Sequence, residues 1–159
     1  MRPPEFWYED VGGRDSAPML RALLAPVSAL YAAAAANRIR NGKPERVSVP
    51  VICIGNLTLG GAGKTPIARA LRAKLGSSAH VLARGYGGRA RGPLRVTRDA
   101  DARDVGDEPL LHAADGETWI ARDRVAGAQA AIAAGAKTIL MDYCFQYPDL
   151  SIVLSIVVI

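Results

Sequence analysis

The chain has 159 residues, of which 50% are hydrophobic and 22% charged, and its formal net charge is +5. This composition excludes collagen-like, mucin-like and strongly disordered chains, and the length is typical of about one domain with its own core. Its two cysteines, Cys53 and Cys144, are too few for a disulfide scaffold and form no CxxC pair of the kind that binds zinc. Because charges and prolines occupy the opening MRPPEFWYED, we expect no signal peptide there. We expect a cytosolic α/β domain.

Charge is distributed unevenly along the sequence. Residues 46–98 include ten lysines and arginines and no acidic residue, whereas residues 99–124 include eight acidic residues and three arginines. A basic block beside an acidic one is typical of a site where phosphates meet carboxylates, and solvated loops are the alternative. A nucleic-acid partner is not expected, because no known nucleic-acid-binding motif is present and the few aromatic residues do not alternate with the basic ones.

The first predicted element is a helix over residues 17–40, where apolar residues recur at spacings of three and four. Its charge-free part, residues 22–36, is shorter than the about 20 apolar residues that a membrane span needs. Aromatic residues precede this helix and basic residues follow it, so an amphipathic helix lying in a bilayer interface is one interpretation. A helix packed on the domain is the other, and the residues alone leave both open.

From residue 47 onward the sequence alternates apolar runs with helical patterns, so we divide the chain into an N-terminal segment, 1–46, and a core, 47–159. Apolar runs predict strands at residues 49–54, 80–83, 94–97, 117–121, 138–141 and 151–159. Helical patterns occupy residues 65–75, 107–114 and 122–134. Strands that alternate with helices predict a mainly parallel, doubly wound sheet.

A glycine-rich loop stands between the first predicted strand and the helix after it. It reads Thr58-Leu59-Gly60-Gly61-Ala62-Gly63-Lys64-Thr65. The last glycine, the lysine and the threonine match the P-loop pattern GxxxxGK[ST], although Thr58 stands where the first glycine belongs. In such loops the backbone N–H groups surround phosphate oxygens, the lysine reaches the β- and γ-phosphates, and the hydroxyl binds Mg²⁺. We therefore predict a P-loop NTPase-like fold in which these eight residues bind ATP.

A second P-loop element is an apolar strand that ends in an aspartate and holds Mg²⁺. The strand predicted at 138–141 ends at Asp142, so Thr65 and Asp142 are the candidate metal ligands. Many strands end in aspartate at a turn, so this pattern alone is weak. Its occurrence together with the P-loop pattern favours a metal-binding role for Asp142.

Several segments resemble one known family. The loop from Ile54 to Pro66 is similar to the phosphate loop of the tetraacyldisaccharide 4'-kinases, the lipid A 4'-kinases of Gram-negative bacteria. The other segments that carry the resemblance are Arg84-Gly85-Tyr86-Gly87-Gly88, Val105-Gly106-Asp107-Glu108-Pro109-Leu110-Leu111, Ala121-Arg122-Asp123-Arg124 and the opening Pro4-Glu5-Phe6-Trp7. The resemblance spans nearly the whole chain but only about the N-terminal half of the family's length.

The resemblance implies an enzyme at the cytoplasmic face of the bacterial inner membrane. It would transfer the γ-phosphate of ATP to the 4'-hydroxyl of a tetraacyldisaccharide 1-phosphate, the lipid A disaccharide precursor, and so form lipid IV-A. In the family the N-terminal helix associates with the membrane surface, which favours the interfacial interpretation. The aspartate at position 107 acts in the family as catalytic base together with a histidine from the second half of the chain. By itself, Asp107 also reads as the N-cap of the helix after it.

Arg84 and Arg122 are further candidates for phosphate contacts, and His80 and His112 read as structural.

Two departures lead us to expect that the chain alone is inactive. Tyr143 and Cys144 stand where the family has Asp and Gly after Asp142, which removes a carboxylate beside the metal ligand. The chain also ends at Ile159 inside an apparent core strand, as in a truncated or frame-disrupted product. The alternatives are a non-catalytic nucleotide- or membrane-binding P-loop module and a complete small kinase of other specificity. The sequence leaves the oligomeric state open.

Overall fold

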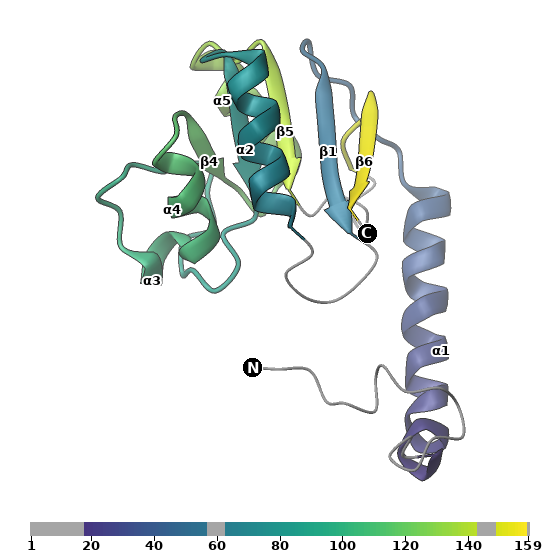
Figure 1. The fold of residues 1–159 in the computed structure, drawn as a ribbon. Helices are drawn as coiled ribbons and strands as arrows, with labels where there is room; N and C mark the ends of the chain where they lie inside the picture. The colour runs from purple at the N-terminus through teal and green to yellow at the C-terminus, as the bar shows by residue number, and fades with distance from the viewer. Residues whose placement is uncertain (1–17, 57–62, 143–148, 159) are drawn as a thin grey trace. The chain divides into compact units, whose positions relative to one another are not determined.

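The computed structural model describes residues 18–56, 63–142 and 149–158. The chain divides into two compact units, residues 1–41 and 42–159. The described part of the first unit is helix α1 (Pro18–Asn41), and the second unit contains a sheet with its helices (Figure 1). The expected boundary between a 1–46 segment and a 47–159 core stays a prediction.

Helix α1 confirms the helix predicted over residues 17–40 and continues through Pro26. Its apolar side chains at Leu23, Val27 and Leu30 follow one another at spacings of four and three and are all exposed. Among the described residues, no helix combines the length and apolar character that crossing a bilayer requires. That this helix is amphipathic and that it associates with a membrane surface both stay predictions.

The second unit alternates strands and helices in chain order. Its elements are β1 (Val51–Asn56), α2 (Lys64–Leu75), β2 (Ala79–Ala83), β3 (Leu94–Arg95), α3 (Ala102–Val105), α4 (Asp107–Ala113), β4 (Thr118–Ile120), α5 (Arg124–Ala133), β5 (Thr138–Asp142) and β6 (Leu154–Val158). The strand order is β3-β4-β2-β5-β1-β6, and every pairing is parallel except that of β3 with β4. The predicted, mainly parallel α/β sheet is therefore confirmed.

The central strands are buried because helices cover both faces of the sheet. Side chains alternate between the two faces along a strand, so each strand serves two cores. One core packs Val51, Leu82 and Met141 of three strands with Ala128 of α5. The opposite core packs apolar residues of β1 and β6 against α2, including Ala68. This arrangement is the doubly wound one that the alternating pattern predicts.

Two short elements differ from the sequence prediction. The four-residue helix α3 was not predicted, and its N-cap Asp101 accepts a hydrogen bond from the backbone N–H of Arg103 at 2.8 Å. Strand β3 is limited to two residues, Leu94 and Arg95, at the edge of the sheet. Among the described strands it pairs with β4 alone.

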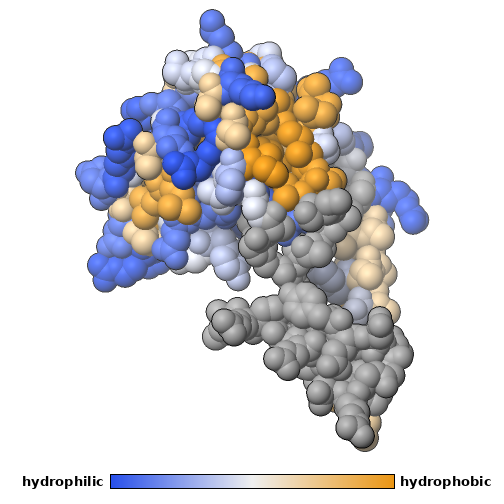
Figure 2. Space-filling model, viewed as in Figure 1, coloured by the Kyte–Doolittle hydropathy of each residue, from blue (hydrophilic) through white to orange (hydrophobic). Residues whose placement is uncertain are grey.

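Strand β6 forms the other edge of the sheet and leaves apolar side chains exposed. Leu154 and Val157 are 50% and 45% exposed. Figure 2 shows apolar surface gathered beside α2, on the side of the unit where β1 and β6 lie in Figure 1. Strand β6 lies within the predicted 151–159 strand and pairs with β1 from Ile52 to Asn56.

Candidate active site

The described part of the phosphate loop is its last three residues, Gly63, Lys64 and Thr65. Gly63 precedes the first residue of α2 with φ 79° and ψ 20°, a left-handed conformation that glycine adopts without the steric penalty of a Cβ. The orphan backbone N–H groups of the first turn of α2 give this helix end a partial positive charge, which favours anions. The other predicted loop residues, Thr58, Leu59, Gly60, Gly61 and Ala62, lie outside the described residues.

Lys64 is buried at the start of α2, and its ammonium group has a defined partner. Nζ of Lys64 donates a hydrogen bond of 2.8 Å to Oδ1 of Asn56, the last residue of β1. The residue as a whole is 6% exposed. The strand before the loop thus positions the ammonium group of Lys64.

Asp142 ends β5, as the sequence predicts. Strand β5 is the direct neighbour of β1, and Asp142 lies opposite Ile54 in the parallel register. The carboxyl ends of these two strands therefore meet at the same edge of the sheet, where the phosphate loop leaves β1. The residue Asp142 is 3% exposed. The predicted metal ligand and the phosphate loop are thus brought together.

Helix α4 adds side chains to this edge that the sequence analysis did not assign to it. Oγ1 of Thr65 lies 3.5 Å from Oε1 of Glu108. Glu108, His112 and Asp142 each offer one ligand atom, and these three atoms lie within 4.8 Å of one another. The spacing of Glu108 and His112, one helical turn apart on a predicted helix, was the signal that could have identified them. Thr65 and Asp142 are therefore connected through Glu108.

Asp107 lies beside this cluster but is exposed. The N-cap of α4 is Gly106, and Asp107 is the first residue of the helix proper. The interpretation of Asp107 as N-cap is therefore wrong: Gly106, at φ 88°, takes that position and its backbone approaches the carbonyl oxygen of Tyr86 so closely that a Cβ would collide with it. The carboxylate of Asp107 is left to solvent or to a bound molecule. Its role as a base stays a prediction.

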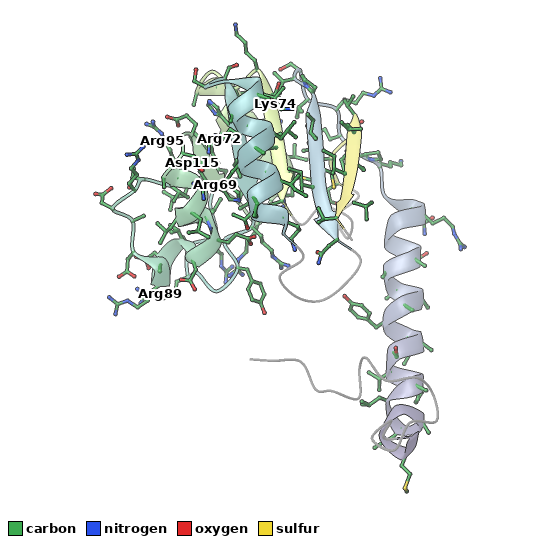
Figure 3. The ribbon with its side chains drawn as sticks, in the orientation of Figure 1. Arg69, Arg72, Lys74, Arg89, Arg95 and Asp115 are labelled. Carbon is green, nitrogen blue, oxygen red and sulfur yellow. The ribbon has the colours of Figure 1, made fainter. Side chains whose placement is uncertain are left out.

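A buried arginine connects α2 to the segment that carries the cluster. Arg72 donates hydrogen bonds to the carbonyl oxygens of His112, at 2.8 Å, and Glu117, at 2.7 Å. Figure 3 shows Arg69, Arg72 and Asp115 gathered between α2 and the α4–β4 segment. The end of α4 is thereby held against the helix that begins at the phosphate loop.

Burial lowers the pKa of the His112 imidazole below its ordinary value, and the nearby Glu108 opposes this shift. The imidazole is therefore neutral near pH 7, with a lone pair on one ring nitrogen. Arg84 and Arg122, the other candidates for phosphate contacts, are exposed.

The doubly wound sheet and a helix that begins at Gly-Lys-Thr after the first strand define the class of P-loop nucleotide-binding proteins. The family model of tetraacyldisaccharide-1-P 4'-kinase matches residues 20–159. The chain therefore belongs to the tetraacyldisaccharide 4'-kinase family, as the sequence motifs indicate.

Individual relatives support this assignment. A protein of Dinoroseobacter shibae named tetraacyldisaccharide 4'-kinase is 52% identical over 166 residues, which include 100% of this chain and 48% of that protein. A protein of Caulobacter vibrioides with the same name is 52% identical over 98% of this chain and 47% of its own length. The crystal structure of "apo" form LpxK from Aquifex aeolicus in complex with ATP has a TM-score of 0.78 and 30% identity over 87% of this chain and 48% of that chain. This chain thus spans about half the length of the curated relatives that it matches.

Proposed function

We propose that this chain supplies the nucleotide-binding part of a lipid kinase. The enzyme transfers the γ-phosphate of ATP to the 4'-hydroxyl of a tetraacyldisaccharide 1-phosphate, which gives lipid IV-A in lipid A biosynthesis. The observation that carries the proposal is the contact of Thr65, next to Lys64 at the start of α2, with Glu108, whose carboxylate lies near that of Asp142. Relatives that bear the kinase name and a solved relative that holds ATP support it.

In this proposal the start of α2 and Lys64 bind the β- and γ-phosphates. The side chain of Lys64 emerges from the first turn of the helix, so its charge and the N-terminal end of the helix act on the same anion. Asn56 orients the ammonium group before the nucleotide binds. Residues 58–62 complete the phosphate loop.

Asp107 is the proposed catalytic base. Its carboxylate is exposed at the start of α4, one residue before Glu108, so a sugar hydroxyl has access to it. A carboxylate within hydrogen-bond reach of the attacking hydroxyl accepts its proton as the bond to phosphorus forms. The neighbouring Glu108 faces the cluster with His112 and Asp142, so the two acidic residues have different environments.

The proposed cofactor of this site is Mg²⁺ with ATP. Oxygen atoms of carboxylates and hydroxyls are the ligands that Mg²⁺ prefers, and Thr65, Glu108 and Asp142 supply such oxygens close together. The residues present therefore fit the ion. When bound, Mg²⁺ neutralises charge that develops on the phosphate oxygens.

We also place the enzyme at a membrane surface, the cytoplasmic face of the inner membrane. The exposed apolar side chains of α1, including Leu23 and Leu30, and the basic residues after the helix, Lys43 and Arg46, have the chemistry of an interfacial segment. Co-sedimentation of the chain with vesicles that contain anionic lipid tests this placement. Binding that survives the double change Leu23→Asp and Leu30→Asp would contradict it.

Binding of ATP by the purified chain in the presence of Mg²⁺ tests the nucleotide site. Lys64→Ala should weaken binding at least about tenfold, because a hydrogen-bonded charge at a phosphate is worth roughly 1.5–3 kcal/mol. Lys74→Ala is the matched control, since it removes the same charge from an exposed position in the last turn of α2. Absence of binding by the unmodified chain, or equal binding by the Lys64 variant, would show that the proposal is wrong.

A non-catalytic nucleotide- or membrane-binding module is the second candidate function, because Tyr143 and Cys144 replace family residues after Asp142. Incubation with γ-labelled ATP and tetraacyldisaccharide 1-phosphate in detergent micelles separates the two, when the chain is joined to the second half of a full-length relative. Labelled lipid that disappears with Asp107→Asn in this joined protein supports the kinase. ATP binding without any labelled lipid in the joined protein supports the module.

A further inference from the structure

The imidazole of His112 is buried beside the carboxylates of the candidate active site. The residue is 0% exposed, and within the described part of the chain neither ring nitrogen has a hydrogen-bond partner. A buried polar group without a partner destabilises the folded chain, so its presence requires an explanation other than packing.

The backbone holds the imidazole in this position. Glu108 and His112 are four residues apart on α4, so their side chains lie on the same face of the helix. Arg72 fixes the last turn of α4 by its hydrogen bond of 2.8 Å to the carbonyl oxygen of His112. Asp142 approaches from the end of β5, and one ring nitrogen of His112 lies within 4.8 Å of a carboxylate oxygen of each partner.

We propose that His112 is a nitrogen ligand of a divalent cation that Glu108 and Asp142 also bind, so that this site takes a first-row transition-metal ion such as Mn²⁺ or Co²⁺ more tightly than Mg²⁺. The proposal deepens the proposed function, because it concerns the cation site of the same P-loop. Two carboxylates and one imidazole are a ligand set that suits such ions, whereas Mg²⁺ prefers oxygen ligands alone. The ion gives the buried imidazole nitrogen a partner that it lacks among the described residues.

The other buried histidine provides an internal comparison. His80 in β2 is 3% exposed, and its Nδ1 also has no hydrogen-bond partner among the described residues. Unlike His112, it belongs to no described cluster of possible metal ligands. A metal that binds through an imidazole should therefore depend on His112 and be indifferent to His80.

Titration of the untagged chain with Co²⁺ alone, followed by its visible absorption, tests the proposal without nucleotide. His112→Gln should weaken Co²⁺ binding at least about tenfold, the usual scale for residues of a metal site, and change Mg²⁺ affinity much less. His80→Gln is the matched control and should leave both affinities unchanged. Thermal unfolding of each variant shows whether it is folded.

Pulsed electron paramagnetic resonance of Mn²⁺ bound to the chain gives a readout that does not depend on the stability of the His112 variant. The chain has two histidines, so the His80→Gln variant retains His112 as its single imidazole. Imidazole nitrogen coupling to Mn²⁺ in this variant, altered by ¹⁵N-labelled histidine, supports the proposal. A Mn²⁺ signal without nitrogen coupling, or no bound Mn²⁺ or Co²⁺, overturns it.

The two proposals fail separately. Nitrogen coupling in a chain that does not bind ATP would leave the metal site and remove the kinase function. ATP binding that depends on Lys64, together with Mn²⁺ held by oxygen ligands alone, would leave the nucleotide site and remove the role of His112.

Discussion

Nζ of Lys64 and Oδ1 of Asn56 are joined by a hydrogen bond of 2.8 Å that links the last residue of β1 to the first residue of α2. Asn56 precedes the phosphate loop and Lys64 lies near its end, so this bond connects the strand before the loop to the helix after it through side chains as well as through the backbone. A neutral amide orients the ammonium group without cancelling its charge, which keeps the group available to a phosphate.

Asn56→Ala should weaken ATP binding several-fold, because it removes the acceptor that orients Lys64. Asn56→Asp should weaken it more, at least about tenfold, because a carboxylate there both pairs with the ammonium group and repels phosphates. Titration calorimetry with ATP and Mg²⁺ measures both variants against the unmodified chain. Tighter binding by the aspartate variant than by the alanine variant would refute this account of the pair.

Replacement by alanine should destabilise the chain more at Gly106 than at Gly76, two glycines that share a positive φ. Gly106→Ala should destabilise the chain by about 2–4 kcal/mol, because strain at φ 88° is joined by collision of the new Cβ with the carbonyl oxygen of Tyr86. At Gly76, with φ 82°, a Cβ would meet nothing within 4 Å, so Gly76→Ala should show the strain alone, about 1–2 kcal/mol. Urea unfolding followed by circular dichroism compares the two, and equal losses would exclude the collision.

The sequence predicts the central strands and helices well, because the signal for each lies within a few neighbouring residues. The apolar run before the phosphate loop, the Gly63-Lys64-Thr65 start of the helix and the strand that ends at Asp142 each carry their signal within a few neighbouring residues. Parallel pairing of β1 with β5 then follows from general rules of α/β connection. Helix α3 escapes prediction because its four residues, ARDV, are too few to display a helical period.

The candidate site was predictable only in part. Lys64, Thr65 and Asp142 belong to motifs that the sequence displays, whereas Glu108 and His112 join them by packing of α4 against the start of α2 and the end of β5. The four-residue spacing of Glu108 and His112 indicates that they share one helix face, but no local pattern reveals which other elements that face contacts. An arginine in a helix likewise reads as exposed, yet Arg72 is 5% exposed because two carbonyl oxygens satisfy its guanidinium.

Arg72→Met should destabilise the folded chain by about 2–3 kcal/mol, because it removes two charge-assisted hydrogen bonds and leaves the carbonyl oxygens of His112 and Glu117 to the backbone N–H groups of Asp115 and Val81. Arg69→Met is the matched control on the same helix. Arg69 bonds to Asp115 at 3.0 Å in an exposed ion pair, and its loss should have a much smaller effect. Urea unfolding of the two variants measures the difference, and similar losses would show that Arg72 is not a structural connection.

Stability should fall as the pH drops below about 6.5, the ordinary pKa of histidine. Burial lowers the pKa of His80 in the folded chain; Glu117 opposes this shift, and Arg72 and Arg95 reinforce it. The unfolded chain therefore binds more protons than the folded one in this range. The contribution of His80 to the free energy of unfolding is complete above the pKa of histidine in the unfolded chain and decreases as the pH falls below it. His112, whose pKa burial also lowers, adds a contribution of the same sign.

His80→Leu tests this linkage, because leucine keeps the position apolar and cannot titrate. Urea unfolding of the unmodified chain between pH 7.5 and 5.5 (about one unit either side of the ordinary histidine pKa) should show a loss of stability, and the variant should show a smaller one. Carboxylates such as Asp115, whose pKa its hydrogen bond with Arg69 lowers, change charge below this range and do not interfere. Parallel pH profiles for the two proteins would mean that His80 is equally easy to protonate in the folded and unfolded chains.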